Sequence, residues 1–236
     1  GKKLKIPIIK RSELLGELIK IKHTSIAVAG THGKTTTSSM IGTILNEAKL
    51  EPTLITGGIV NQFNSNYKSG SGDIIIVEAD EYDKSFLSLS PTYITINNIE
   101  LEHLDIYNDI EDINENFIKF SNSIPFYGIV SLCSDSKYLN QIKNKIKFHY
   151  KTFGIDKESD VMAKNIKYKN NKTYFSVTTN NKKEFNIELL VPGKHNVYNA
   201  LSAITLCLEI NIPIKYITTG LKKYSGVKRR FQIKHL

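Results

Sequence analysis

Residues 27–37 read AVAGTHGKTTT, and this stretch decides the fold. Residues 25–29 are a short apolar run with β-branched members, which predicts a buried strand. From Thr35 onward, apolar residues recur at helical spacing. The two glycines therefore lie in a strand-to-helix turn, where backbone N–H groups and the positive end of the helix dipole can bind phosphate.

The loop also supplies side chains suited to a nucleotide. Lys34 adds a mobile positive charge, and the Thr35 hydroxyl is a ligand for the Mg²⁺ that accompanies a triphosphate. The match to the usual phosphate-loop pattern is incomplete because Val28 stands where its first glycine belongs, so we expect Gly30 to supply the turn. The alternative is an ordinary helix entry with a threonine cap, but the flanking strand and helix favour nucleotide binding.

Composition narrows the class of protein. The chain has 236 residues, enough for one large α/β domain, and it contains no apolar run near the roughly 20 residues that span a bilayer. Without such a run we expect no membrane partner. The net charge is +9, but the lysines are scattered, so we expect no nucleic-acid partner either. Cys133 and Cys207 lie far apart and fit two buried thiols in a reducing compartment, which points to the cytoplasm.

Acidic residues follow a second buried strand. Residues 73–79 are nearly continuously apolar, as in a central parallel strand, and Glu78 lies at the carboxyl end, where open α/β sheets bind ligands. We expect Glu78 to face the Mg²⁺ of the loop, against the alternative of a solvated acidic loop. His103 follows the strand predicted at residues 93–98 and is either a metal ligand or base, or a structural histidine.

The remaining pattern completes an α/β fold. Residues 52–56 predict a strand that Gly57 and Gly58 end in a turn, and residues 61–72 predict a flexible loop. A helix is expected over residues 110–123, a buried strand over 128–133 and an antiparallel meander over 148–191.

The segment HNVYNAL at residues 195–201 opens an apolar helix. Asn196 and Asn199 fall on one helix face, so both amides can address one partner, and an Asn amide can pair with the edge of adenine. Helix capping by Asn196 is the equal alternative. Near the C-terminus, Arg229 and Arg230 form either a solvated basic patch or a phosphate contact.

Taken together, five motifs in this order resemble the signature of the Mur ligases, and most closely of the branch that joins L-alanine to UDP-N-acetylmuramate. They are GTHGKTT at 30–36, EADE at 78–81, NIE at 98–100 with His103, HNVYNAL at 195–201 and RRF at 229–231. The resemblance covers nearly the whole chain. Two departures are Glu102, where Asp is common, and Tyr82, where Ser is frequent.

The resemblance implies roles for individual residues. Catalysis would involve Lys34, Glu78, His103 and Arg230, and the metal ligands would be Thr35, Glu78 and His103. Nucleotide contacts would come from Gly30, Thr31, His32, Gly33, Lys34, Thr35, Thr36, His195, Asn196, Asn199 and Arg230.

The resemblance also implies an activity: an enzyme that uses ATP and Mg²⁺ to ligate L-alanine to UDP-N-acetylmuramate through an acyl phosphate, in peptidoglycan precursor synthesis. A related Mur-type or folylpolyglutamate-type ligase, or a phosphate-loop switch NTPase, is the alternative. The expected fold is a doubly wound, mainly parallel sheet with a small antiparallel meander beside it. The family has three domains, so we expect residues 1–22 to lead in from a missing N-terminal domain, residues 23–225 to form the central ATP-binding domain, and residues 226–236 to join a missing C-terminal domain. Without those domains, the chain is expected to be inactive alone.

Overall fold

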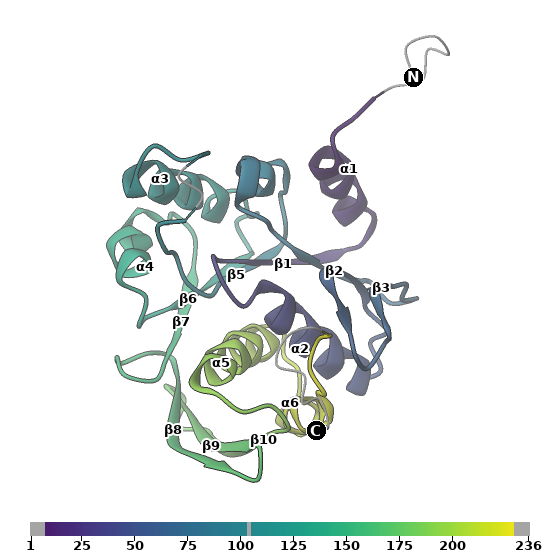
Figure 1. The fold of residues 1–236 in the computed structure, drawn as a ribbon, viewed down its shortest axis with the longest axis vertical. Helices are drawn as coiled ribbons and strands as arrows, with labels where there is room; N and C mark the ends of the chain where they lie inside the picture. The colour runs from purple at the N-terminus through teal and green to yellow at the C-terminus, as the bar shows by residue number, and fades with distance from the viewer. Residues whose placement is uncertain (1–7, 103–104, 229–236) are drawn as a thin grey trace.

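A computed structural model describes residues 8–102 and 105–228, and their strands form one ten-stranded sheet (Figure 1). The strand order is β10-β9-β8-β7-β6-β5-β1-β4-β2-β3. The strands are β1 (Thr24–Ala29), β2 (Thr53–Val60), β3 (Ser65–Lys68), β4 (Ile74–Glu78), β5 (Tyr93–Ile96), β6 (Ile129–Cys133), β7 (Tyr150–Gly154), β8 (Val161–Lys169), β9 (Lys172–Thr179) and β10 (Glu184–Leu189).

The centre of the sheet is parallel. β1 pairs in parallel with β4 and β5, and β2, β6 and β7 extend the parallel region on either side. Strands buried on both faces are expected to be continuously apolar, and the Ile-Ile-Ile-Val run of β4 fits this pattern.

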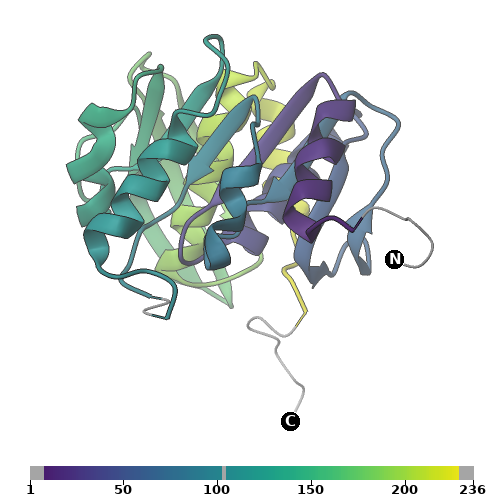
Figure 2. The ribbon, with the colours of Figure 1, turned by 90° about the horizontal axis from the view of Figure 1, so that it is seen from above.

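Helices cover both faces of the sheet, as Figure 2 shows. One face carries α2 (Lys34–Glu47), α5 (Lys194–Glu209) and α6 (Ile214–Lys223), which pack against one another. The other carries α1 (Arg11–Leu18), α3 (Ile110–Ser121), α4 (Lys137–Ile142) and the 3-10 helix Tyr82–Ser88. The predicted doubly wound α/β fold is therefore confirmed. None of the described helices is long and apolar enough to cross a bilayer.

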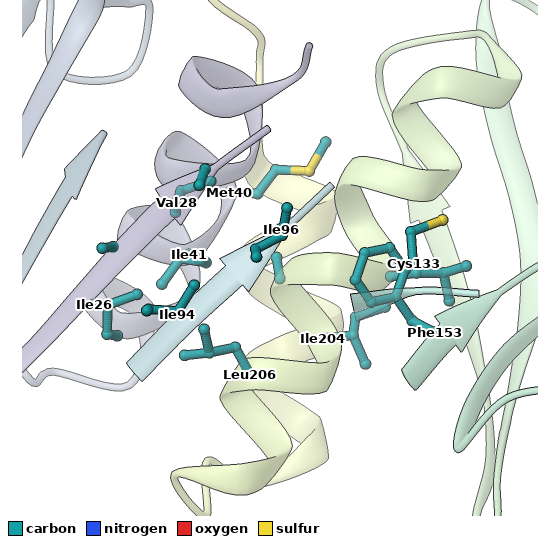
Figure 3. Close-up of a cluster of buried hydrophobic side chains, with 14 of the residues drawn as sticks. Ile26, Val28, Met40, Ile41, Ile94, Ile96, Cys133, Phe153, Ile204 and Leu206 are labelled. Carbon is teal, nitrogen blue, oxygen red and sulfur yellow. The ribbon is translucent and has the colours of Figure 1, made fainter. Parts of the chain in front are cut away.

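The core between the sheet and the α2–α5 layer holds the central elements together (Figure 3). Side chains from β1 and β5 interleave there with side chains from the two helices, all of them nearly inaccessible to solvent: Ile26, Val28, Met40, Ile41, Ile94, Ile96, Ile204 and Leu206. Cys133 and Cys207 are both buried and free, as the sequence predicted.

Three sequence predictions about the edges of the sheet are wrong. Gly57 and Gly58 do not turn the chain, because β2 continues through them to Val60. Residues 61–72 are not simply a loop, since they contain β3, which pairs antiparallel with β2. Within the predicted meander, β7 instead pairs in parallel with β6.

The antiparallel strands continue the main sheet. β8 pairs in parallel with the end of β7, and β8, β9 and β10 then pair antiparallel with one another. The meander is therefore joined by hydrogen bonds to the parallel sheet, and it places the start of α5 beside the loops that follow β5 and β6.

Candidate nucleotide-binding site

The glycine-rich loop lies between β1 and α2, at the point where the direction of winding reverses. The chain leaves β1 toward β2 over the α2 face, whereas it leaves neighbouring β5 toward β6 over the opposite face. In open α/β sheets, the crevice at such a reversal is where ligands bind.

Two glycines give the loop its shape. Gly30 follows β1 with φ of +124°, which confirms that it supplies the turn, and a Cβ there would lie 3.0 Å from the carbonyl oxygen of Asn98. Gly33 has φ of +82° and is the N-cap of α2. Because a glycine offers no capping side chain, the first N–H groups of α2 remain available to an anion.

The loop is braced by two asparagines that the sequence-based site did not include. The Asn98 carbonyl accepts a hydrogen bond from the Thr31 N–H, and its Oδ1 accepts one from the His32 N–H at 2.8 Å. The Asn97 amide donates to the His32 carbonyl at 3.2 Å and to the Thr37 hydroxyl at 3.0 Å. The run Asn97-Asn98 directly after a strand was the available signal.

Lys34, the first residue of α2, folds back over the loop. Its Nζ lies 2.9 Å from the Gly30 carbonyl oxygen and 2.7 Å from Oε2 of Glu81. Glu81 is buried, and sequence reasoning missed it, although it belongs to the EADE run.

Thr35 and Glu78 lie in direct contact. The Thr35 hydroxyl donates to Glu78 Oε2 at 3.0 Å, and Glu78 Oε1 accepts from the Gly57 N–H at 2.8 Å. A hydroxyl and a carboxylate beside a phosphate loop are the oxygen ligands that Mg²⁺ prefers, so this donor set fits that ion.

A third group of polar side chains surrounds His32 on the surface. Its Nε2 lies 3.5 Å from Glu100 Oε2 and 3.3 Å from Glu102 Oε1. All three side chains are well exposed, so the contact between them is weak. The Thr31 hydroxyl accepts a hydrogen bond from the Glu100 N–H at 2.9 Å, which ties this segment to the loop.

A cavity of about 770 Å³ opens beside the loop. Its size is in the range of ligand pockets. Six of the predicted nucleotide contacts line it: His32, Gly33, Thr36, His195, Asn196 and Asn199.

The two asparagines of α5 contact different groups. The Asn196 amide donates to the Pro192 carbonyl at 2.7 Å. Asn199 Oδ1 lies 3.4 Å from the Thr37 hydroxyl, and a Cβ on Gly33 would come within 2.2 Å of it. Asn199 therefore packs directly on the phosphate loop, whereas Asn196 fixes the turn before α5.

Asp135 organises the far wall of the cavity. Its carboxylate accepts hydrogen bonds from the backbone N–H groups of residues 155–157 and from the Tyr198 hydroxyl. Burial alone would raise the pKa of Asp135, but these hydrogen bonds outweigh it and hold the pKa below its usual range. Nearby, burial raises the pKa of the Cys133 thiol to about 11, so this thiol is protonated at neutral pH.

Comparison with known proteins identifies the family. Residues 28–207 match the Mur ligase middle domain. This chain belongs to the Mur ligase family. It is 45% identical to a UDP-N-acetylmuramate–L-alanine ligase of Desulforapulum autotrophicum over 97% of this chain and 50% of that protein.

Solved Mur ligase structures share the fold. A UDP-N-acetylmuramate–alanine ligase from Thermotoga maritima superposes with a TM-score of 0.86 at 28% identity, covering 99% of this chain and 53% of that one. The Neisseria meningitides ligase of UDP-N-acetylmuramate and L-alanyl-γ-D-glutamyl-meso-diaminopimelate gives a TM-score of 0.84 at 26% identity, covering 96% of this chain and 74% of that one. The chain spans about half the length of the curated relatives it matches.

The described parts of the Mur ligase motifs thus lie close together in the structure. Residues 30–36, Glu78 and the start of α5 lie around one crevice. His103, Arg229 and Arg230 lie outside the described residues, so their roles stay predictions.

Proposed function

We propose that this chain is the ATP-binding part of an enzyme that ligates L-alanine to UDP-N-acetylmuramate in the cytoplasm, during synthesis of peptidoglycan precursors. The contact that carries the proposal is the 3.0 Å hydrogen bond between the Thr35 hydroxyl and Glu78, because it brings two hard oxygen donors together beside the phosphate loop. Relatives at 42% to 45% identity that carry the L-alanine ligase name support the substrates.

The nucleotide would lie along the crevice from cavity to loop. In this proposal the adenine enters the cavity beside Asn196 and Asn199. The phosphates accept hydrogen bonds from the N–H groups of residues 33–35 at the start of α2, because the N–H groups of Thr31 and His32 already donate to Asn98. Lys34 supplies the charge that neutralises the β- and γ-phosphates. Arg230 is a further proposed phosphate contact, on sequence grounds alone.

Mg²⁺ would be held by Thr35 and Glu78, with His103 as a third ligand proposed from the sequence. When bound, the ion neutralises charge on the phosphates and orients them. The residues of the chain do the rest by holding the triphosphate in a fixed position and by offering preorganised N–H donors.

The reaction overcomes the poor leaving ability of a carboxylate oxygen. A carboxylate oxygen of UDP-N-acetylmuramate bonds to the γ-phosphorus while the bond from that phosphorus to ADP breaks. The amine of L-alanine then bonds to the acyl carbon, which releases inorganic phosphate and a proton. Lys34 acts in the first step, where negative charge gathers on the transferring group.

Two alternatives differ in substrate. The Neisseria ligase joins a peptide to the same UDP-sugar, but its identity to this chain is 26%, against 45% for the L-alanine ligase of Desulforapulum. A folylpolyglutamate-type ligase or a phosphate-loop switch would share the loop, and a switch would have no use for the two asparagines of α5.

We further propose that residues 23–225 form the central ATP-binding domain, with residues 1–22 and 226–236 as junctions to flanking domains. The chain spans about half the length of its curated relatives, which supports this division.

Nucleotide binding tests the proposal. Titration calorimetry with Mg²⁺ should show that ATP binds more tightly than GTP. A thermal shift should follow, since ligand at about 100 times Kd stabilises a protein by about 2.7 kcal/mol. Thr35→Val keeps the volume of the side chain but removes the hydroxyl, so the gain in ATP affinity from Mg²⁺ should shrink. A preference for GTP would favour the switch alternative instead.

A further inference from the structure

The ammonium of Lys34 is fully engaged by the protein itself. A lysine ammonium has three N–H donors. Nζ lies 2.9 Å from the Gly30 carbonyl, 3.4 Å from the Thr31 carbonyl and 2.7 Å from Glu81 Oε2. The side chains of Lys34 and Glu81 are 16% and 4% exposed, so water screens this ion pair little.

Glu81 is held firmly in place. Its carbonyl oxygen accepts a 2.5 Å hydrogen bond from the hydroxyl of Tyr107, a residue only 2% exposed. Burial, reinforced by the nearby carboxylates, raises the pKa of Tyr107 well above its usual range, so the hydroxyl remains a donor at neutral pH.

The segment after Glu81 adds to this constraint. Asp83 and Lys84 have φ of +54° and +53°, a left-handed conformation that non-glycine residues adopt at a cost. Lys84 pairs with Asp112 on α3 at 3.0 Å, and its Nζ lies 5.2 Å above the centre of the Tyr107 ring. Glu81 therefore cannot easily follow Lys34 if the ammonium moves.

An incoming phosphate oxygen must replace one of the three acceptors around Lys34. The two carbonyls belong to the loop that would cradle the phosphates, whereas Glu81 reaches Lys34 from a different element and carries a negative charge. We propose that Glu81 is a positioning residue that holds Lys34 against the loop carbonyls and competes with the nucleotide phosphates for its ammonium. This inference rests on the proposed nucleotide-binding function.

Glu81→Gln tests the competition because glutamine keeps the shape of the side chain and removes its charge. Calorimetric affinities for ATP and adenosine are compared in wild type and variant. ATP affinity should rise about tenfold, equivalent to about 1.4 kcal/mol. Adenosine has no phosphates, so its affinity should stay within about twofold, the usual range for independent effects. A structural disturbance would weaken both ligands together.

Asp80→Asn is the matched control. Asp80 is the preceding residue, but its carboxylate is 58% exposed and lies 3.8 Å from Lys34 Nζ. Removing this charge should change ATP affinity by less than about twofold, as expected for an exposed ion pair.

Two further variants separate contact from charge. Glu81→Asp keeps the charge but shortens the side chain by one methylene, so ATP affinity should rise by less than in Glu81→Gln. This variant also serves if Glu81→Gln does not fold. In a Lys34→Ala background, the effect of Glu81→Gln should largely disappear, because the competition acts through Lys34.

The outcomes separate this inference from the proposed function. No ATP binding by the wild-type chain would overturn both. Suppose that the wild-type chain binds ATP, but that the ratio of ATP affinity to adenosine affinity is unchanged or reduced in both Glu81 variants. That result would overturn only the role of Glu81. A gain in ATP affinity that persists in full without Lys34 would also overturn it, since Glu81 would then act directly on the phosphates.

Discussion

At the scale of single residues, Glu78 connects two parts of the site. One carboxylate oxygen accepts from the Thr35 hydroxyl and the other from the Gly57 N–H. We predict that Glu78→Gln weakens Mn²⁺ binding to the ATP-bound chain by about tenfold or more, because even partners of metal ligands typically contribute about 10- to 100-fold. The measurement is Mn²⁺ titration by electron paramagnetic resonance.

Glu100→Gln provides the control for this prediction. Glu100 also borders the cavity, but it contacts His32 and not Thr35. Its substitution should leave Mn²⁺ affinity nearly unchanged. Equal losses of Mn²⁺ affinity in the two variants would show that Glu78 is not a ligand of the proposed metal site.

The placement of the acidic run EADE at residues 78–81 could be predicted from the sequence only in part. Its position after a buried strand correctly predicted that acids would lie beside the phosphate loop. It did not reveal that Glu81 would be buried against Lys34, because the chain turns directly after β4 into a 3-10 helix. Which acid in a short run points inward depends on that turn and not on spacing.

At the scale of elements, Asp135 joins the end of β6 to the segment after β7 and to α5. Asparagine would face the same backbone N–H donors with an amide that can no longer accept from all of them. We predict that Asp135→Asn lowers the free energy of unfolding by about 1–3 kcal/mol, as expected for hydrogen bonds to a charged group. Urea denaturation at pH 7 measures it.

The effect should depend on pH with a definite sign. The hydrogen bonds lower the pKa of Asp135 in the folded state, so the ionised form stabilises the fold above the unfolded pKa of about 3.9 and this contribution fades as pH falls through the folded pKa. The stability gap between wild type and Asp135→Asn should therefore narrow below about pH 4. Asp156→Asn, which breaks only an exposed ion pair with Lys194, should cost little at any pH. A gap that is constant down to pH 3 would contradict this account.

Some elements could be predicted from the sequence and others could not. The strands at residues 74–78 and 129–133 were found because burial on both faces gives continuous apolar runs. β3 is polar, and only its pairing with β2 makes it a strand. α6 was missed although Ile217 and Leu221 repeat at helical spacing, so that signal was available.

At the scale of the whole molecule, strand order assembles the site. The loop after β1, Glu78 at the end of β4 and Asn98 after β5 are neighbours because β4 and β5 flank β1 in the sheet. Sequence reasoning placed each of these residues at a strand end, but it could not give the order of the strands. The side-by-side placement of Asn97 and Asn199, 102 positions apart, follows from that order and from the packing of α5 on the sheet.

The whole-molecule prediction is that this chain binds ATP and does not ligate by itself. It spans about half the length of its curated relatives, and the cavity and loop described above account for a nucleotide only. Holding two reactants in line can contribute about 7–11 kcal/mol, so its absence suppresses turnover by many orders of magnitude.

The test incubates the chain with ATP, Mg²⁺, L-alanine and UDP-N-acetylmuramate and measures UDP-N-acetylmuramoyl-L-alanine by chromatography. The full-length Desulforapulum relative provides the positive control, and calorimetric ATP binding by the same sample of the chain shows that it is folded and competent. Product at a rate typical of enzymes, about 1 s⁻¹ or more, would mean that both substrates are held by residues 1–236. The proposed division into a central nucleotide-binding domain and flanking substrate domains would then be wrong, while the assignment of Lys34, Thr35 and Glu78 to the phosphates and the metal would survive.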